Sequence, residues 1–211
     1  DSDNDELNDY DEINEHNTDP MHSDSDGDGL NDKLEAINLE SNPLNDDSDN
    51  DGLSDYWEWG RASQGYQYSL MLNDTDADGT LDGDEDLDVD GLTNLEEINN
   101  YGTNPLVVDT DEDSLWDGDE VKPWEINKDG VNNQYNYPSN PTLPDTDGDG
   151  LSDYEEVTPS NDTYDSRTDP EDSDTDGDGL SDYDEIRWYW NITGDNNTAR
   201  SYYDEQGWNT S

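Results

Sequence analysis

A 12-residue acidic pattern recurs along this chain of 211 residues and limits what the chain can fold into. The pattern is Asp-x-Asp-x-Asp-Gly-Leu-x-Asp-x-x-Glu, and its eight copies are called loops 1 to 8. In order, they are Asp1–Glu12, Asp24–Glu35, Asp47–Glu58, Asp74–Glu85, Asp86–Glu97, Asp109–Glu120, Asp145–Glu156 and Asp174–Glu185. Such self-similarity predicts a repeat array in place of a domain with one core.

The composition gives little material for a conventional core. Asp and Glu number 61 against 7 Lys and Arg, the formal net charge is −54, and only 26% of the residues are hydrophobic. Low hydrophobicity with high net charge is typical of disordered chains, because too little apolar surface is buried to offset the chain entropy. The chain therefore either stays unfolded or is ordered by a cofactor that cancels charge.

The same features exclude several classes of function. So negative a chain is not expected to bind nucleic acid or anionic membrane surfaces. It has no apolar run long enough for a membrane span and no cysteine for disulfides. It shows neither a Ser–His or Cys–His pairing nor a Gly-rich phosphate loop, so we expect no enzyme. Because Asp1 already lies inside a motif, we expect a mature fragment or one segment of a longer protein.

The spacing of the acids matches the needs of Ca²⁺, which takes six to eight oxygen ligands. Acids at positions 1, 3 and 5 place three carboxylates inside a tight loop, and Gly at position 6 permits the turn. Position 7 offers its backbone carbonyl, position 9 contributes directly or through water, and Glu at position 12 returns to bind with both oxygens. Mg²⁺ fits less well because it prefers octahedral geometry and retained waters, and zinc would need His or Cys.

This reasoning assigns six metal ligands to each loop, for about eight ions or more. In loops 1 to 4 they are Asp1, Asp3, Asp5, Leu7, Asp9, Glu12; Asp24, Asp26, Asp28, Leu30, Asp32, Glu35; Asp47, Asp49, Asp51, Leu53, Asp55, Glu58; Asp74, Asp76, Asp78, Thr80, Asp82 and Glu85. In loops 5 to 8 they are Asp86, Asp88, Asp90, Leu92, Asn94, Glu97; Asp109, Asp111, Asp113, Leu115, Asp117, Glu120; Asp145, Asp147, Asp149, Leu151, Asp153, Glu156; Asp174, Asp176, Asp178, Leu180, Asp182 and Glu185.

Three copies depart from the pattern and are expected to bind more weakly. Glu6 and Ser114 stand in the Gly slot, and Asn94 replaces Asp at position 9. A ninth, degenerate copy lies around Asp129, with Lys128 intruding among its ligands. The two histidines, His16 and His22, are interpreted as solvated loop residues.

Two further features accompany the loops. An Asp-Pro or Asn-Pro pair, preceded by Ser or Thr, ends four residues before loops 2, 3, 6, 7 and 8, and predicts a turn that directs the chain into the next loop. The leucines at position 7 are expected to pack on residues just after each loop, namely Ile13, Trp59, Ile98, Val121, Val157 and Ile186. After each loop there is room for two or three helical turns, and Ser152 with Glu155 resembles a capping box.

These units resemble thrombospondin type 3 repeats in their cysteine-free, prokaryotic form. The residues that carry the resemblance are Gly91–Glu120, with Tyr-Gly-Thr-Asn-Pro at 101–105, and the loops Asp145–Glu156 and Asp174–Glu185. The resemblance implies an extended calcium-stabilised array of mostly irregular loops with short helical turns and no large hydrophobic core. It also implies an extracellular or cell-surface location, a role as stalk or spacer, and ions that neighbouring loops share.

A dockerin-like protein-recognition module is the alternative, because the 12 residues also resemble an EF-hand loop. Several loops start 23 residues apart, which leaves no room for a full helix on each side of each loop. Eight tandem loops are also too many for one dockerin.

The pattern divides the chain into tandem repeats over 1–121, with an aromatic insertion at 60–73, and over 145–186. Between them lies a degenerate segment at 122–144, and an aromatic segment occupies 187–211. The Trp and Tyr residues of the insertions either pack locally against the array or form an interface with another copy or with sugar.

Sequons for N-glycosylation lie outside the ion slots, at Asn73, Asn161, Asn191, Asn196 and Asn209. If Ser211 is joined to Asp1, three residues separate Trp208 from the first Asp of loop 1, the same number that separates each Pro from its loop inside the array. This suggests self-association as a head-to-tail unit of a fibril, or continuation into a longer surface protein.

Overall fold

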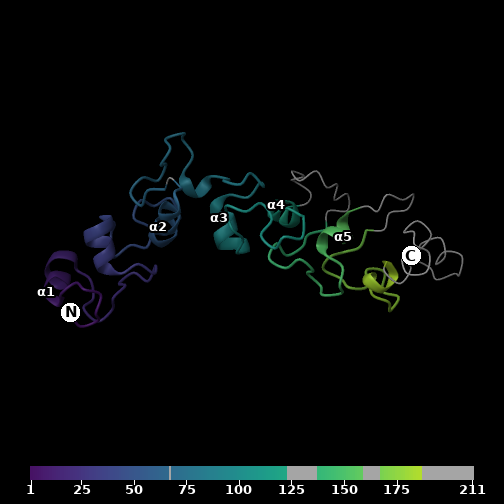
Figure 1. Ribbon diagram of the computed structural model, residues 1–211, viewed down its shortest axis with the longest axis horizontal. Helices are drawn as coiled ribbons and strands as arrows, with labels where there is room; N and C mark the ends of the chain where they lie inside the picture. The colour runs from purple at the N-terminus through teal and green to yellow at the C-terminus, as the bar shows by residue number, and fades with distance from the viewer. Residues whose placement is uncertain (67, 123–136, 159–166, 187–211) are drawn as a thin grey trace, which may run out of the picture. The chain divides into compact units, whose positions relative to one another are not determined.

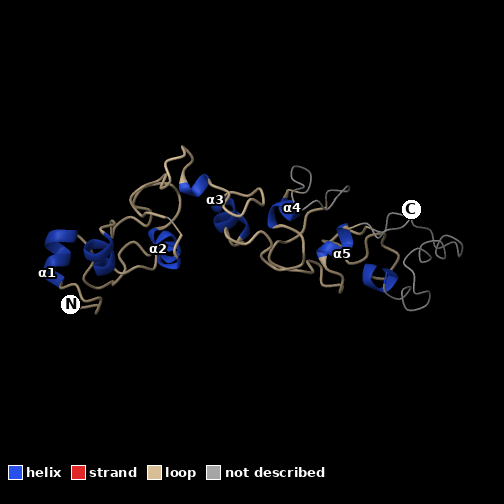
Figure 2. Cartoon of the chain, turned by 45° about the horizontal axis from the view of Figure 1, so that its top comes forward, coloured by secondary structure: helices blue, strands red, loops and turns tan. Residues whose placement is uncertain are grey.

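The computed structural model describes residues 1–66, 68–122, 137–158 and 167–186 (Figure 1). In these ranges the chain consists of loops and short helices, and no strand occurs (Figure 2). The chain forms two compact units: unit 1 is Asp1–Glu85 with Thr93–Leu95, and unit 2 is Asp86–Leu92 with Glu96–Ser211. The expected loop-rich repeat array without a large core is confirmed.

The helical segments begin at positions 9 to 12 of the loops, so each starts inside the last third of a 12-residue copy. The first half of the chain contains α1 (Asp9–Asp11), the π-helical turns η1 (Glu12–His16) and η2 (Leu34–Leu39), α2 (Asp55–Gln64) and the 3-10 turn η3 (Asp82–Asp84). They are followed by α3 (Asn94–Glu96), the π-helical turn η4 (Glu97–Tyr101), α4 (Asp117–Val121) and α5 (Asp153–Val157), and residues 182–186 are helical as well.

Position 8 acts as the helix cap in several loops. Asn8 and Ser54 accept hydrogen bonds from backbone N–H groups of the first helical turn. Ser152 and Glu155 form the expected capping box, in which each side chain bonds the other's backbone N–H. The caps fix where each helix begins, and therefore where the Glu at position 12 comes to lie.

The Asx-Pro pairs form β-turns, as their composition predicts. The carbonyls of Asn42 and Asn140 accept the N–H three residues later at 2.9 Å, and the corresponding prolines are buried. The same turn precedes loop 4, where Ser69 O accepts Leu72 N–H at 3.0 Å and buried Leu70 stands in the proline slot. That turn lacks the sequence signature and could not be read from it.

Acids occupy much of the interior. The buried apolar residues include the position-7 leucines of loops 1, 2, 3, 5, 6 and 7. The acids at positions 9 and 12 are also buried in most loops. Val157 is 0% exposed and fits the expected packing after the loop, but Ile13 is 58% exposed and Trp59 is 37% exposed. The expected apolar knot is therefore incomplete at these two residues.

Part of the first insertion packs locally. Tyr68 is buried, and its ring meets Trp57 edge to face with centroids 5.1 Å apart. The guanidinium of Arg61 lies 5.1 Å from the centroid of the Trp57 ring. These contacts favour local packing for Tyr68, while most aromatic residues of the later insertions lie outside the described residues.

The close contact at Gly83 generates a prediction about stability. A Cβ at Gly83 would lie 2.5 Å from the carbonyl oxygen of Asp51 and 2.9 Å from Leu95 Cδ1, whereas a Cβ at Gly60, inside α2, would meet nothing within 4 Å. We expect Gly83→Ala to destabilise the calcium-loaded chain by about 1–3 kcal/mol, because backbone must move. Gly60→Ala is expected to be neutral or stabilising by up to about 1 kcal/mol, because alanine favours a helix. Thermal unfolding of both variants checks this, and equal effects would contradict the packing.

Candidate metal centres

Each loop is closed by its own backbone. Positions 4 and 6 both have a left-handed backbone, as at Asn50 (φ 65°) and Gly52 (φ 99°). This conformation turns their N–H groups inward, where both donate to the carboxylate of Asp47 at position 1, at 2.7 and 2.9 Å. The position-1 acid therefore organises the turn, and Gly or Asn at these positions reduces the conformational cost.

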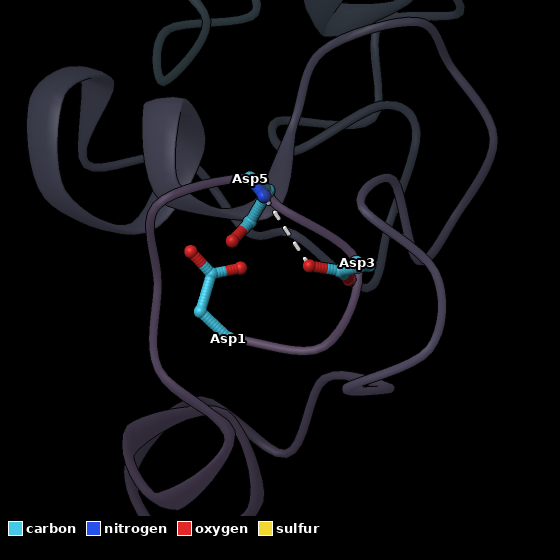
Figure 3. Close-up of side chains that lie close together, drawn as sticks. All are labelled: Asp1, Asp3 and Asp5. Carbon is cyan, nitrogen blue, oxygen red and sulfur yellow. Dashed lines mark hydrogen bonds between the residues drawn. The ribbon is translucent and has the colours of Figure 1, made fainter.

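The carboxylates at positions 1, 3 and 5 converge, as Figure 3 shows for Asp1, Asp3 and Asp5. In loops 1 to 4, one oxygen from each of the three lies within 4.8 Å of the others. One oxygen of position 3 accepts the N–H of position 5, and one oxygen of position 5 accepts the N–H of position 7, at 3.3 and 2.7 Å in loop 1. The second oxygen of position 3 is buried without a hydrogen-bond partner at Asp3, Asp26, Asp88, Asp111 and Asp147.

The Glu at position 12 returns to the loop through one helical turn. Its N–H bonds the carbonyl of position 8 in loops 1, 2, 3, 6, 7 and 8, which fixes the start of that turn. Glu12, Glu35, Glu58, Glu97 and Glu156 are 0% exposed, and each has at least one carboxylate oxygen without a hydrogen-bond donor. Buried, unpaired carboxylate oxygens are costly unless a cation balances them, and hard oxygen donors are what Ca²⁺ prefers. The donor set therefore fits calcium.

A Ser or Thr at position 2 holds the Asp at position 9, a role that sequence reasoning missed. In loop 7, Thr146 donates its N–H and its hydroxyl to the two oxygens of Asp153, at 2.8 and 2.7 Å. The same hydroxyl accepts the N–H of Asn140 in the preceding Asx-Pro turn at 2.9 Å. Loop 5 lacks both partners of this bond, because it has Leu87 at position 2 and Asn94 at position 9. The joint change at these two positions was visible in the sequence.

The Ser or Thr before each Asx-Pro pair was also missed as a supporting residue. Thr103, Ser139 and Thr168 donate their hydroxyls to the position-12 Glu of the loop before them, at 3.2, 3.0 and 2.9 Å. Each therefore orients one oxygen of that Glu and leaves the other turned elsewhere. The recurrence of a hydroxyl residue before every Asx-Pro pair was the available signal.

Consecutive loops stack through a repeated contact, which we call the stacking contact. In it, the second oxygen of position 5 accepts the N–H of position 10 in the following loop. The distances are 2.8 Å from Tyr56 to Asp28, 2.7 Å from Gly118 to Asp90, 2.7 Å from Tyr154 to Asp113 and 2.6 Å from Tyr183 to Asp149. A candidate ligand of one loop is thus held by a hydrogen bond from the next loop.

Stacking also brings acids of two loops together. Asp51 and Glu58, at positions 5 and 12 of loop 3, meet Asp82, at position 9 of loop 4, with one oxygen of each within 4.8 Å of the others. All three side chains are buried. Position 9 therefore lies against the ligands of the preceding loop, a placement that the spacing inside one loop could not reveal.

The three irregular copies keep the loop geometry by different means. Glu6 and Ser114 adopt the left-handed conformation of the Gly slot, with φ of 75° and 96°. Glu6 also forms an ion pair with Lys33 at position 10 of loop 2, at 2.6 Å. Asn94 donates its amide N–H groups to the carbonyl of Asp82 at 2.7 Å and to the hydroxyl of Tyr68 at 3.2 Å, and its Oδ1 is buried without a hydrogen-bond partner.

The electrostatics of the ion-free loops oppose ionisation of the position-12 Glu. Burial raises the pKa of Glu58 to about 9, because desolvation disfavours the charged form and Asp49 and Asp51 lie close by. Burial is likewise the main cause that raises the pKa of Glu35 to about 8, of Glu97 and Glu156 to about 9, and of Glu120 to about 10. In each case carboxylates at positions 3 and 5 of the same loop add to the shift.

Comparison with protein families matches the sequence model of the bacterial thrombospondin type 3 repeat. The match covers residues 1–22, 24–46, 47–58, 86–107, 145–158 and 174–187, together just over half of the chain. The chain belongs to this family. The resemblance noted in the sequence is thereby confirmed, and the family is a structural calcium-binding repeat and not a family of enzymes. Loops 4 and 6 lie outside the matched segments, and comparisons with curated proteins and with solved structures found no match.

The raised pKa values predict opposite pH dependences with and without calcium. In the ion-free fold the pKa of Glu58 is about 9 against an ordinary value of 4.5. An acid with a raised pKa stabilises the fold below its ordinary pKa, and this contribution is lost as the pH rises through the raised value. Without calcium, we therefore expect order to increase as the pH falls from about 9 to about 5. With saturating calcium, order should instead decrease at low pH, because protons compete with the ion.

Circular dichroism melts across this pH range, with and without calcium, measure both trends in the same protein. Parallel trends in the two conditions would show that these carboxylates do not hold the ion.

Proposed function

We propose that the chain is a structural, non-catalytic calcium-binding rod whose fold depends on the ions. The observation that carries this proposal is the burial of carboxylates without cationic partners. Position-9 and position-12 acids are enclosed in most loops, yet the whole sequence holds only 7 Lys and Arg against 61 acids. Among the described residues, the lysines that form ion pairs are Lys33 and Lys122. Their partners are Glu6 at position 6 and Glu96 at position 11, which are not candidate ligands. Bound divalent cations supply the missing positive charge.

The ligand set proposed for each ion follows from the geometry. Carboxylates at positions 1, 3 and 5, the carbonyl of position 7 and the Glu at position 12 hold one ion in each loop. The Asp at position 9 joins positions 5 and 12 of the loop before it, which supports ions shared between neighbouring loops, so the total is about eight or more.

An extracellular stalk, fibre or adhesin segment is the role we propose for such a rod. The stacking contact passes from loop to loop and suits a spacer that self-associates or continues a longer surface protein. None of the described helices is long and apolar enough to cross a membrane. Asn73 is exposed and open to a glycan, whereas the other four sequons, at Asn161, Asn191, Asn196 and Asn209, lie outside the described residues.

The dockerin-like alternative predicts isolated loop pairs that recognise a partner domain. The stacking contacts among loops 1, 2 and 3 and among loops 5 to 8 favour an array instead.

Removal of calcium tests the proposal most simply. We expect a calcium chelator at neutral pH to abolish the circular dichroism signal and the protease resistance together, because the ions are the folding element. Readdition of calcium should restore both, and magnesium at the same concentration should restore them poorly. Protease resistance that survives excess chelator would contradict the proposal.

A further inference from the structure

Loop 4 differs from the three loops before it in its exposure to solvent. Asp76, Asp78 and Thr80, at positions 3, 5 and 7, are all exposed. At the equivalent positions of loops 1 to 3, the position-5 acids are buried or half-buried and the position-7 leucines are 6%, 2% and 1% exposed. Loop 4 alone carries a polar residue, Thr80, at position 7, so its sequence matches its exposure.

The stacking contact is missing from loop 4. Asp5 and Asp28 accept the N–H of position 10 in the next loop, and the second oxygen of Asp51 is buried without a hydrogen-bond partner. Asp78 is exposed and accepts only the N–H of Thr80, at 2.8 Å, among the described residues. A Cβ at Gly29 would meet the ring of Tyr56 at 3.3 Å, but a Cβ at Gly79 would meet no described atom within 4 Å. Among the described residues, no neighbouring loop therefore donates a hydrogen bond to Asp78.

The residues that would make this contact are engaged elsewhere in unit 1. Leu95, at position 10 of loop 5, lies against Gly52 of loop 3 and against Gly83, at 2.8 and 2.9 Å from the Cβ positions of those glycines. Its neighbour Asn94 is fully buried and donates to the carbonyl of Asp82 and the hydroxyl of Tyr68. This segment thus passes loop 4 and docks on loop 3, held in part by Tyr68 from the aromatic insertion.

We propose that loop 4 is an open, low-affinity calcium site that gains and loses its ion while loops 1 to 3 keep theirs. The inference rests on the proposed function, because it assumes that the loops bind calcium. Exposed carboxylates interact with an ion at high dielectric and are screened by salt, which weakens their hold. The buried cluster of Asp51, Glu58 and Asp82 takes only its position-9 acid from loop 4, and it holds its ion more tightly because its ligands are enclosed.

The consequence is a calcium-responsive segment inside an otherwise persistent array. Over an intermediate range of free calcium, loop 4 is without its ion while loops 1 to 3 keep theirs, since calcium affinity in such loops depends on the rigidity of the ligands. Loop 8 is also exposed, but the chain after Ile186 lies outside the described residues, so the comparison is confined to loops 1 to 4.

The test compares the full chain with two variants at the same loop position, Asp78→Asn in loop 4 and Asp28→Asn in loop 2. Equilibrium dialysis with radioactive calcium counts bound ions against free calcium, and thermal unfolding at saturating calcium reports stability. We expect the weakest ions of the unmodified chain to dissociate at free calcium at least about tenfold above the rest. Asp78→Asn should remove one of these weak ions and lower the unfolding temperature less than Asp28→Asn does, because a weakly bound ion contributes less stability. Asp28→Asn should remove a tightly bound ion and lower that temperature.

Two results would overturn the inference on its own. One is a single class of tight sites in the unmodified chain, and the other is a loss of stability in Asp78→Asn as large as in Asp28→Asn. A chain that binds no calcium at all would overturn the proposed function as well, so the two failures are distinguishable.

Discussion

Repulsion between converging carboxylates is the constraint on which the rest of the structure depends. Loops 1 to 4 gather acids at positions 1, 3 and 5 within a few ångströms, and six of the eight loops enclose a Glu at position 12. Ionised together in a medium of low dielectric, these groups oppose the fold, and the raised pKa of Glu58 and its equivalents expresses that opposition. A divalent cation reverses the sign of this interaction and makes the same acids the main source of cohesion. The chain can therefore fold with a small apolar interior.

Stacking links loops 1 to 3 within unit 1 and loops 5 to 8 within unit 2. Where loops stack, the position-10 residue of one loop contacts the residues at positions 5 and 6 of the loop before it. The residue type at position 10 complements the one at position 6. A ring of Tyr56 covers Gly29 and a ring of Tyr183 covers Gly150, while Lys33 pairs with Glu6. The substitution of Glu for Gly in loop 1 is thus accommodated by a charge on the next loop. At the junction of loops 3 and 4, the position-9 acid Asp82 likewise lies beside the candidate ligands Asp51 and Glu58.

The local part of this architecture was predictable from the sequence, because a loop of 12 residues is fixed by its own backbone bonds. The spacing of the acids, the turn at the Asx-Pro pairs and the capping box at Ser152 all depend on residues close in sequence. The support given by the hydroxyls of Thr146 and Ser139 was readable but overlooked. The docking of Leu95 on Gly52 was not predictable, because it joins residues 43 positions apart and depends on an insertion without a repeat pattern. The exposure of loop 4 depends on the same docking, so it was not predictable from the 12-residue pattern either.

The direct test of the account is to locate the ions by long-wavelength anomalous diffraction from crystals grown in calcium. The account predicts a calcium peak among positions 1, 3, 5, 7 and 12 of each loop, and a further peak among Asp51, Glu58 and Asp82. Enclosed acids at these positions without a calcium peak beside them, in a chain that is nevertheless folded, would contradict the claim that calcium holds the fold together.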